Sequence, residues 1–158
     1  MRRHNWDLFP SSPVTYTSLK RFERAKSYLQ QKGFHILEGS LTGRYDFYRS
    51  GSIQERAEEL NALIRNPNIS CIMSTIGGIY SNSLLPYIDY DAFLNNPKIM
   101  IGYSDATALL LGIYVKTGIP HFMGQLSSLP LANLNLLLIA HTNILQKLYY
   151  MINLFLII

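Results

Sequence analysis

The run Ile-Met-Ile-Gly-Tyr-Ser-Asp-Ala, residues 99–106, decides the fold of this chain. Its first half is apolar, as in a strand buried on both faces, and an apolar helix pattern follows over 106–116. A buried strand that turns directly into a helix is the repeating unit of an open, mostly parallel α/β sheet. Because the helix is apolar nearly all round, we expect it to be largely buried.

The segments before this run alternate in the same way. Apolar residues recur at helical spacing over 18–32, and Ser52 and Glu55 form a capping box in which each side chain pairs with a free amide of the other. In chain order we predict a helix at 18–32, a strand at 34–37, a helix from Ser52 to about Arg65, a strand at 69–75, short helical pieces at 81–88 and 89–96, a strand at 98–102 and a helix at 106–116. The fold class is therefore α/β, with an open, mostly parallel sheet and flanking helices.

The turn around Ser104 has two interpretations. As a nucleophile elbow it would project Ser104 from the carboxyl end of a strand, and the amide of Asp105 would stabilise an oxyanion at the start of the helix. As an ordinary helix start, Ser104 or Asp105 would cap the first turn. The pattern is G-x-S-x-A rather than G-x-S-x-G, so spacing alone leaves both interpretations open.

A pair of glycines, Gly77 and Gly78, follows the apolar strand at 69–75. Paired glycines allow backbone amides to point at a bound anion, although the same pair also occurs in ordinary tight turns. This turn and the Ser104 turn both follow strand carboxyl ends, where open α/β sheets bind their ligands. The sequence therefore places both turns at the expected ligand crevice.

Composition narrows the classes of function. Of the 158 residues, 48% are hydrophobic and 15% are charged, and the formal net charge is +4. The basic helix at 18–32 is interrupted by Glu23 and accompanies no nucleic-acid motif, so we expect a solvated face and no nucleic-acid partner. The single cysteine, Cys71, lies in an apolar run and is expected to be buried. The sequence shows no Cys/His cluster with metal-ligand spacing and no signal-peptide core, which favours a cytoplasmic protein.

Three stretches of the chain resemble one known family. They are Ser-Thr-Ile-Gly-Gly at 74–78, Ser-Asn-Ser-Leu-Leu-Pro-Tyr-Ile-Asp-Tyr-Asp at 81–91, and Asn-Pro-Lys-Ile-Met-Ile-Gly-Tyr-Ser-Asp-Ala-Thr-Ala-Leu at 96–109, with shorter matches at 11–13, 51–52 and 116–118. In order and spacing they resemble the LD-carboxypeptidase family of serine peptidases, in the branch that includes microcin C immunity. The resemblance covers about residues 10–124.

The resemblance implies a role for each site residue. Ser104 would be the nucleophile, and the backbone amides of Gly78 and Asp105 would form the oxyanion hole. Three further residues are candidates for substrate binding: Gly77, Ser81 and Asn82. The implied reaction is hydrolysis of an amide bond next to a free carboxylate, in a murein peptide with an L,D-linkage or in an aminoacyl-nucleotide. It uses no metal and no cofactor.

The family's catalytic Glu and His come from a C-terminal domain. The histidines of this chain are His4, His35, His121 and His141, and none of them matches the family's catalytic histidine. We expect His121 to be a partly exposed residue at the end of a strand rather than a member of a triad. Because a serine without a base is a poor nucleophile, we expect the chain to be inactive alone.

The two ends of the chain depart from the family. Members open with a strand resembling Gly-Asp-Thr-Ile-Gly-Ile-Tyr-Ser-Pro, which residues 3–10 do not match, and 124–158 contain one charge, Lys147, and no acid. We divide the chain into an aberrant N-terminus at 1–10, the family's N-terminal α/β domain at 11–124 and an aberrant apolar tail at 125–158. The first strand and the C-terminal domain are expected to be missing. Synonymous codons can be chosen that turn both ends into family-like peptides in another frame, so we hypothesise out-of-frame translation.

Three functions remain open from the sequence. The first is an inactive hydrolase fragment acting on a small peptide or aminoacyl-nucleotide, whose full-length relatives are expected to pair as homodimers. The second is a non-enzymatic α/β binding module. The third is a membrane-associated fragment anchored by residues 134–158, although polar residues interrupt that segment and a clean membrane span is not expected.

Overall fold

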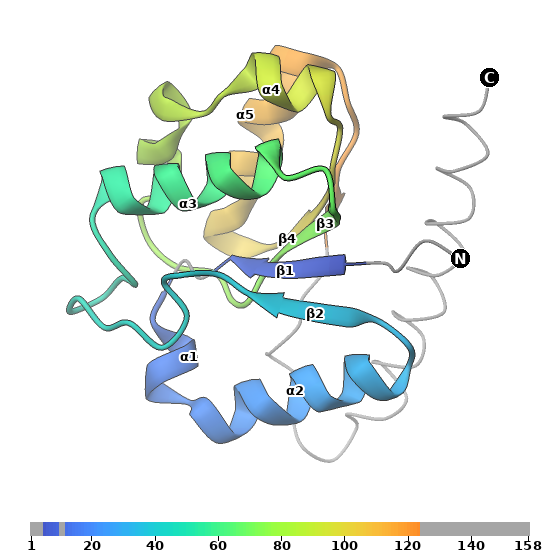
Figure 1. Cartoon of the computed structure of the whole chain (residues 1–158). Helices are drawn as coiled ribbons and strands as arrows, with labels where there is room; N and C mark the ends of the chain where they lie inside the picture. The colour runs from blue at the N-terminus through green and yellow to red at the C-terminus, as the bar shows by residue number, and fades with distance from the viewer. Residues whose placement is uncertain (1–4, 10–11, 124–158) are drawn as a thin grey trace. The chain divides into compact units, whose positions relative to one another are not determined.

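The computed structural model describes residues 5–9 and 12–123, and a parallel sheet forms their centre (Figure 1). The five strands are β1 (Asn5–Phe9), β2 (His35–Glu38), β3 (Ile69–Ser74), β4 (Ile99–Gly102) and β5 (Phe122–Met123), and they lie in the order β2-β1-β3-β4-β5. Every neighbouring pair is parallel. The order reverses between β1 and β3, and a reversal of this kind opens a ligand crevice at the carboxyl ends of the strands. The predicted fold class is confirmed.

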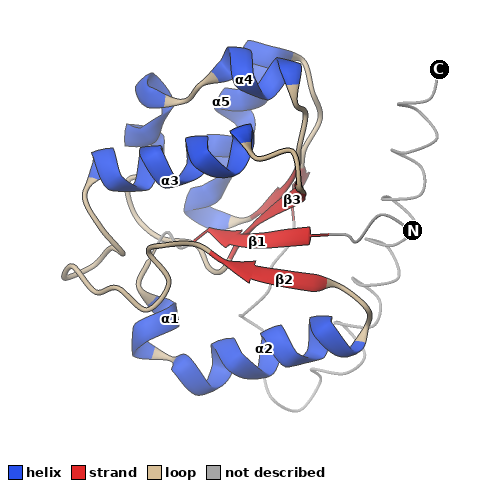
Figure 2. Ribbon diagram, viewed as in Figure 1, coloured by secondary structure: helices blue, strands red, loops and turns tan. Residues whose placement is uncertain are grey.

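Helices cover both faces of the sheet (Figure 2). On one face lie α1 (Val14–Thr17) and α2 (Leu19–Gln31), and on the other lie α3 (Ile53–Arg65), α4 (Tyr90–Asn95) and α5 (Thr107–Thr117). Two 3-10 helices, η1 (Ser81–Tyr87) and η2 (Ser104–Ala106), follow the carboxyl ends of β3 and β4. The chain crosses from β1 to β2 in one direction and returns for the later strands, so right-handed connections place the first helices opposite the others.

The main hydrophobic core lies between the sheet and the helices α3, α4 and α5. It takes buried side chains from β3 and β4, from these three helices and from η1; the largest fully buried ones are Leu60, Ile64, Ile72, Leu84, Phe93, Leu109 and Ile113. A strand buried on both faces needs a nearly continuous apolar sequence. This explains why β3 reads Ile-Ser-Cys-Ile-Met-Ser, with Cys71 fully buried as predicted. Burial raises the pKa of the Cys71 thiol well above its ordinary value.

The helix α3 begins at the predicted capping box. The Glu55 amide donates to the Ser52 hydroxyl oxygen at 3.2 Å, and the Ser52 amide donates to a Glu55 carboxylate oxygen at 2.9 Å. These bonds, with the Arg44 guanidinium, lower the pKa of Glu55 to about 2. The box fixes where α3 starts, and therefore which of its residues face the sheet.

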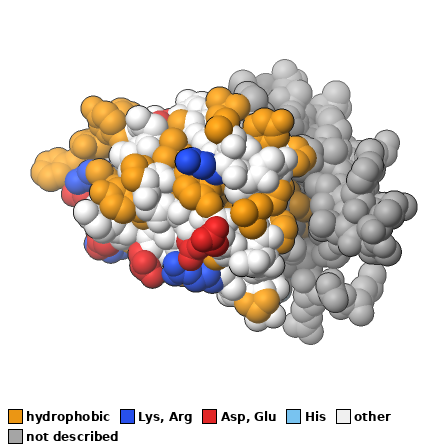
Figure 3. All heavy atoms as spheres, turned by 90° about the horizontal axis from the view of Figure 1, so that it is seen from above, with side chains coloured by type: hydrophobic (Ala, Val, Ile, Leu, Met, Phe, Trp, Pro, Cys, Tyr) orange, Lys and Arg blue, Asp and Glu red, His pale blue; other side chains and the backbone are white. Residues whose placement is uncertain are grey.

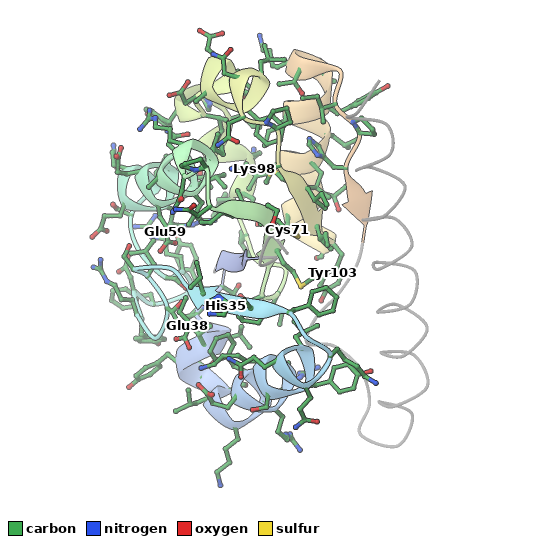
Figure 4. All side chains as sticks on the ribbon, turned by 45° about the vertical axis from the view of Figure 1, so that its right-hand side comes forward. His35, Glu38, Glu59, Cys71, Lys98 and Tyr103 are labelled. Carbon is green, nitrogen blue, oxygen red and sulfur yellow. The ribbon has the colours of Figure 1, made fainter. Side chains whose placement is uncertain are left out.

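A buried lysine joins the end of α3 to the sheet. The Lys98 ammonium, labelled in Figure 4, donates to the carbonyl oxygens of Asn66 and Ile69, each at 2.6 Å. Only 3% of the residue is exposed, and burial lowers its pKa to about 8. The two carbonyls compensate for the buried charge, so Lys98 fixes the start of β3 beside the start of β4.

The expectation that the first strand is missing was wrong. Residues Asn5–Phe9 form β1, which pairs in parallel with β2 on one side and β3 on the other. Pairing of this kind uses backbone groups, which every non-proline residue carries, so a sequence unlike the family's opening strand still fills the central position. The sheet has no gap there.

The expectation that the helix at 106–116 is largely buried was wrong for one of its faces. Leu109, Leu110 and Ile113 are buried, but Leu111 is 59% exposed and Val115 is 78% exposed. The helix packs on β4, η1 and α4, and a single helix can turn only part of its circumference toward such neighbours. Apolar side chains accordingly lie in several patches on the face seen from above (Figure 3).

Candidate active site

Ser104 lies in a strained turn between β4 and α5. Its backbone φ is +57°, in the left-handed region that residues with a side chain rarely adopt, and its side chain is exposed. Such a conformation costs on the order of 1–3 kcal/mol and persists only where the surroundings impose it. Ser104 is not the helix cap either, because the N-cap residues are Tyr103 for η2 and Ala106 for α5. The elbow geometry is present, and the simple capping explanation for Ser104 is excluded.

The glycine turn after β3 packs directly against this elbow. A Cβ atom at Gly77 would lie 2.7 Å from the Ser104 Cβ, 2.8 Å from its Oγ and 3.6 Å from the Asp105 backbone nitrogen. Real Cβ atoms do not approach other heavy atoms so closely, so residue 77 has to be glycine for the two turns to meet. The neighbouring Gly78 is partly exposed. The two turns therefore meet at the carboxyl ends of β3 and β4.

A carboxylate ties the elbow to the start of η1. The Ser81 amide donates to both carboxylate oxygens of Asp105, at 3.1 and 3.2 Å, and the Ser81 hydroxyl donates to Oδ2. Ser81 is fully buried, whereas Asp105 is partly exposed. Hydrogen bonds to a carboxylate are stronger than those between neutral groups, so this contact joins the turns after β3 and β4.

The remaining candidate, Asn82, lies in η1, which follows the carboxyl end of β3, and its side chain is exposed. Tyr80, just before η1, is also exposed and has a backbone φ of +69°. The Tyr80 ring meets the Tyr48 ring edge to face at 5.9 Å, and the Arg49 guanidinium lies 5.4 Å from the centre of the Tyr48 ring. Aromatic side chains of the 39–52 connection therefore border the turn that carries Ser81.

Two buried charged side chains of α3 were missed by the sequence analysis. Arg56 is fully buried, and Glu59 is 6% exposed. The Glu59 carboxylate (labelled in Figure 4) accepts from the Leu41 amide at 2.7 Å and from the Ser40 hydroxyl at 3.1 Å. A signal for Arg56 existed, because it lies three residues after Ile53 and four before Leu60, and so on the apolar face of the helix.

These buried charges have shifted pKa values. Burial lowers the pKa of Arg56, and the negative charge of Asp105 acts in the opposite direction. Burial raises the pKa of Glu59, against its hydrogen bonds from Leu41 and Ser40. Arg56 thus places a buried positive charge within electrostatic range of the carboxylate that joins the two turns.

The histidines in the described residues do not provide a base for Ser104. His121 precedes Phe122, and Phe122 pairs with Ile101. His121 is therefore level with Met100 in β4, on the order of 10 Å from the carboxyl end of that strand. Its ring packs edge-on against Phe93, neither ring nitrogen has a partner in the described residues, and burial lowers its pKa to about 4. His35 is exposed on β2, while His4 and His141 lie outside the described residues.

Residues 5–9 and 12–123 contain neither a metal-binding cluster nor a membrane-spanning helix. No group of three or more His, Cys, Asp or Glu side chains could hold a metal ion. No helix in the same residues is long and apolar enough to cross a membrane. The segment at 134–158, which the membrane-associated interpretation requires, lies outside the described residues.

Comparison with known proteins gives relatives of high similarity. The family described as LD-carboxypeptidase N-terminal domain matches residues 8–124. A candidate carboxypeptidase of Vibrio cholerae is 68% identical over 115 residues, which are 73% of this chain and 34% of that protein. The microcin C7 self-immunity protein MccF of Escherichia coli is 62% identical over 114 residues, 72% of this chain and 33% of MccF. The chain thus spans about a third of the length of these relatives.

Solved structures agree with the sequence comparison. The structure of MccF in complex with aspartyl sulfamoyl adenosine has a TM-score of 0.74 and 57% identity, covering 77% of this chain and 36% of that one. An MccF-like protein of Bacillus anthracis has the same TM-score at 35% identity, covering 79% of this chain and 38% of that one. On the family match over residues 8–124 and on these relatives, the chain belongs to the LD-carboxypeptidase family.

Proposed function

We propose that this chain supplies the nucleophile half of a serine carboxypeptidase site, with Ser104 as the nucleophile. The observation that carries the proposal is the backbone of Ser104, which is strained, exposed and positioned between a buried strand and a helix. A strained turn that exposes a serine serves attack on a carbonyl group and does nothing for stability. The amides of Gly78 and Asp105 are proposed as the oxyanion hole, which the contact of Gly77 with Ser104 supports.

The reaction follows from these roles. The Ser104 Oγ forms a bond to the substrate carbonyl carbon while its proton passes to a base, and the carbonyl oxygen takes the negative charge beside the two amides. The carbon–nitrogen bond then breaks, and the nitrogen takes the proton as it leaves. Water hydrolyses the resulting acyl-serine by the same route, which releases the free acid and restores the serine.

The base and its partner acid are proposed to lie outside residues 8–124. The resemblance assigns them to a Glu and a His of another domain. His121 lies too far from the elbow to act as the base, and His35 is exposed on another strand, β2. Without a base Ser104 remains a neutral alcohol. We therefore propose that the 158 residues alone do not turn over substrate.

The proposed substrate is an aminoacyl-nucleotide, and a murein L,D-peptide is the alternative within the family. One relative supports this choice: MccF is 62% identical to this chain, and its structures hold aspartyl sulfamoyl adenosine or glutamyl sulfamoyl guanosine. In such a molecule the scissile bond joins an aminoacyl carbonyl to nitrogen. Neither a metal nor a cofactor takes part in the proposed steps.

Two further parts of the proposal concern place and assembly. The single cysteine is buried and unpaired, which suits the reducing cytoplasm. The full-length relatives are proposed to form homodimers. Light scattering on a full-length relative tests the second part, and a monomer at micromolar concentration would rule it out.

A chimera tests the function. Residues 1–123 are joined to the part of Escherichia coli MccF that follows its match to this chain, and aspartate release from aspartyl sulfamoyl adenosine is measured. We expect the chimera to hydrolyse the compound and the 158-residue chain to leave it intact. Ser104→Ala in the chimera should reduce kcat by about 10⁴-fold or more.

The matched control is Ser83→Ala, which removes another serine hydroxyl near the elbow, one that donates to the Tyr80 carbonyl at 2.6 Å. It should leave kcat nearly unchanged. An active chimera that loses nothing on Ser104→Ala would refute the assignment of the nucleophile. A chimera that binds the compound without cleaving it would favour the binding-module function.

A further inference from the structure

The contact between Asp105 and Ser81 joins two segments that both belong to the proposed site. Asp105 follows the proposed nucleophile directly, and Ser81 begins η1, three residues after Gly78. The two residues are 24 positions apart in sequence, so the contact is tertiary. Each segment also contributes one of the two proposed oxyanion amides.

The start of η1 receives hydrogen-bond acceptors from this carboxylate. The N-cap residue, Tyr80, has a left-handed backbone and makes no side-chain cap hydrogen bond. The first amides of a helix take their acceptors from outside the helix backbone. Asp105 supplies an acceptor to the Ser81 amide from another element, and it also accepts from the Ser81 hydroxyl.

A buried positive charge lies within electrostatic range of this carboxylate. Arg56 is fully buried, and the negative charge of Asp105 opposes the effect of burial on the Arg56 pKa. The Ser81 amide and hydroxyl both donate to Asp105. Hydrogen bonds to a carboxylate are stronger than those between neutral groups, so this contact holds Ser81 firmly.

We infer that the Asp105 side chain is a positioning residue, which holds the 77–81 turn against the Ser104 elbow through Ser81 and so fixes the two amides of the oxyanion hole. The inference rests on the proposed function and adds a second role for Asp105, whose backbone amide and side chain then act together. It also gives Ser81 a task other than substrate contact, since its buried hydroxyl already donates to Asp105.

Such positioning matters because an oxyanion hole acts through fixed donors. Removing one donor typically costs 10²–10³-fold in kcat, and a misplacement of about 1 Å can cost 10²-fold. A glycine-rich turn has little side-chain packing to hold it, so its geometry depends on contacts at its ends. At one end Gly77 contacts Ser104, and at the other Ser81 is bound by Asp105.

The test is NMR relaxation on the 158-residue chain. It measures backbone motion directly and needs no catalysis. The order parameter of an amide is about 0.85 in rigid backbone and below about 0.6 in flexible backbone. We expect the amides of Gly78 and Ser81 to be rigid in the parent chain and to fall toward 0.6 in Asp105→Ala. Ser81→Ala should lower the Gly78 value by a smaller amount, since the Ser81 amide still donates.

A conservative substitution and two controls separate positioning from general destabilisation. Asp105→Asn keeps an acceptor oxygen without the charge, so the Gly78 order parameter should recover partly. Asp91→Ala removes the acid in the first turn of α4, and Ser83→Ala removes a hydroxyl within η1. Both should leave Gly78 unchanged. The amide of Ile72 in β3 should stay rigid in every variant.

Two results would overturn the inference. One is an unchanged order parameter at Gly78 in Asp105→Ala, and the other is a fall at Ile72 equal to that at Gly78, which would mean general loosening. Failure of the proposed function looks different: an inactive chimera together with the expected order parameters would reject the nucleophile assignment and leave the tie between the turns intact.

Discussion

Two glycines of this molecule make the same kind of contact in different places. A Cβ atom at Gly77 would lie 2.7 Å from the Ser104 Cβ, and a Cβ atom at Gly39 would lie 2.4 Å from the Glu59 Oε1. At the first contact the partner is exposed and its backbone is strained. At the second the partner is a buried carboxylate, held by the Leu41 amide and the Ser40 hydroxyl.

The difference between these contacts separates a functional approach from a structural one. At Gly77 the close atom is a Cβ fixed to the backbone, so the approach holds a reactive turn in place. At Gly39 the close atoms are at the end of a longer side chain, and the approach allows backbone and hydroxyl donors to satisfy a buried charge. We expect changes at the first site to affect kcat and changes at the second to affect the free energy of unfolding.

Among changes that test these two glycine contacts, the largest effect is expected from Gly77→Ala in the chimera. The added methyl group would have to displace the Ser104 backbone, which moves the nucleophile relative to the oxyanion amides. We expect kcat to fall by about 10²–10³-fold with little change in KM, since the loss is confined to the transition state. Steady-state aspartate release measures both constants. A rise in KM of the same size, with kcat unchanged, would show that Gly77 acts in substrate binding instead.

A smaller effect is expected from Gly39→Ala, and on stability rather than catalysis. The methyl group would push the Glu59 carboxylate away from its donors, and overpacking of this kind costs typically 1–3 kcal/mol. Urea unfolding of the 158-residue chain measures this loss of folding free energy. In the chimera kcat should be unchanged.

The double variant Gly39→Ala/Glu59→Ala makes this test specific. Removing the Glu59 carboxylate gives the new methyl group room, so the two losses should add up to more than the loss in the double variant. Strict additivity would show that the two residues do not interact, and the structural half of the comparison would then fail.

His121 is expected to contribute only to stability, and less than Gly39. Burial lowers its pKa to about 4 from the ordinary 6.5, so the folded state resists a proton that the unfolded state accepts. Stability is therefore fully present above pH 6.5 and is lost as the pH falls toward 4. His121→Phe should remove this loss and raise stability at pH 5 by about 1 kcal/mol, after allowing for solvent screening.

Urea midpoints at pH 7 and pH 5, measured on the parent chain and on the variant, check this prediction. A chimera that loses its activity on His121→Phe would make His121 the base, against its position near the middle of the sheet.

The sequence predicted the elements that carry the site, and the limits of the prediction have physical causes. Periodicity placed β3, β4 and α5 within one or two residues, because buried strands and helices demand apolar residues at fixed spacing. It missed β1, which pairs through its backbone between β2 and β3, because family-like side chains are not needed for that pairing. Out-of-frame translation of both ends of the chain stays a prediction that the nucleotide sequence will decide.

The site shows the same division. The sequence predicted that the Gly77 turn and the Ser104 turn both lie at strand carboxyl ends, where ligands bind, but it did not predict the contact between them. The tie from Asp105 to Ser81 could not be predicted, because it depends on the side-chain geometry of two residues 24 positions apart. Glu59 was also missed, because a helix carries many acids and its burial arises from the connection at 39–52 folding over it.

The smallest effect is expected from Glu59→Gln. This substitution tests whether an ionised Glu59, at its contact with Gly39, lowers the free energy of unfolding. Burial raises the pKa of Glu59 in the folded state, against the donors that lower it. The folded chain therefore keeps its proton at a pH where the unfolded chain has lost it. The contribution of Glu59 to stability is fully present below its ordinary pKa of 4.5 and falls as the pH rises through the folded value.

Glutamine has the same shape and no charge, so Glu59→Gln should flatten the urea midpoint between pH 4.5 and 7 relative to the parent chain. A parent chain whose stability instead rises over this range, and loses that rise in Glu59→Gln, would mean that the Leu41 and Ser40 donors outweigh burial. The close contact at Gly39 would then stabilise an ionised carboxylate, as the close contact at Gly77 is proposed to stabilise an oxyanion. The two contacts would differ only in which negatively charged oxygen they stabilise.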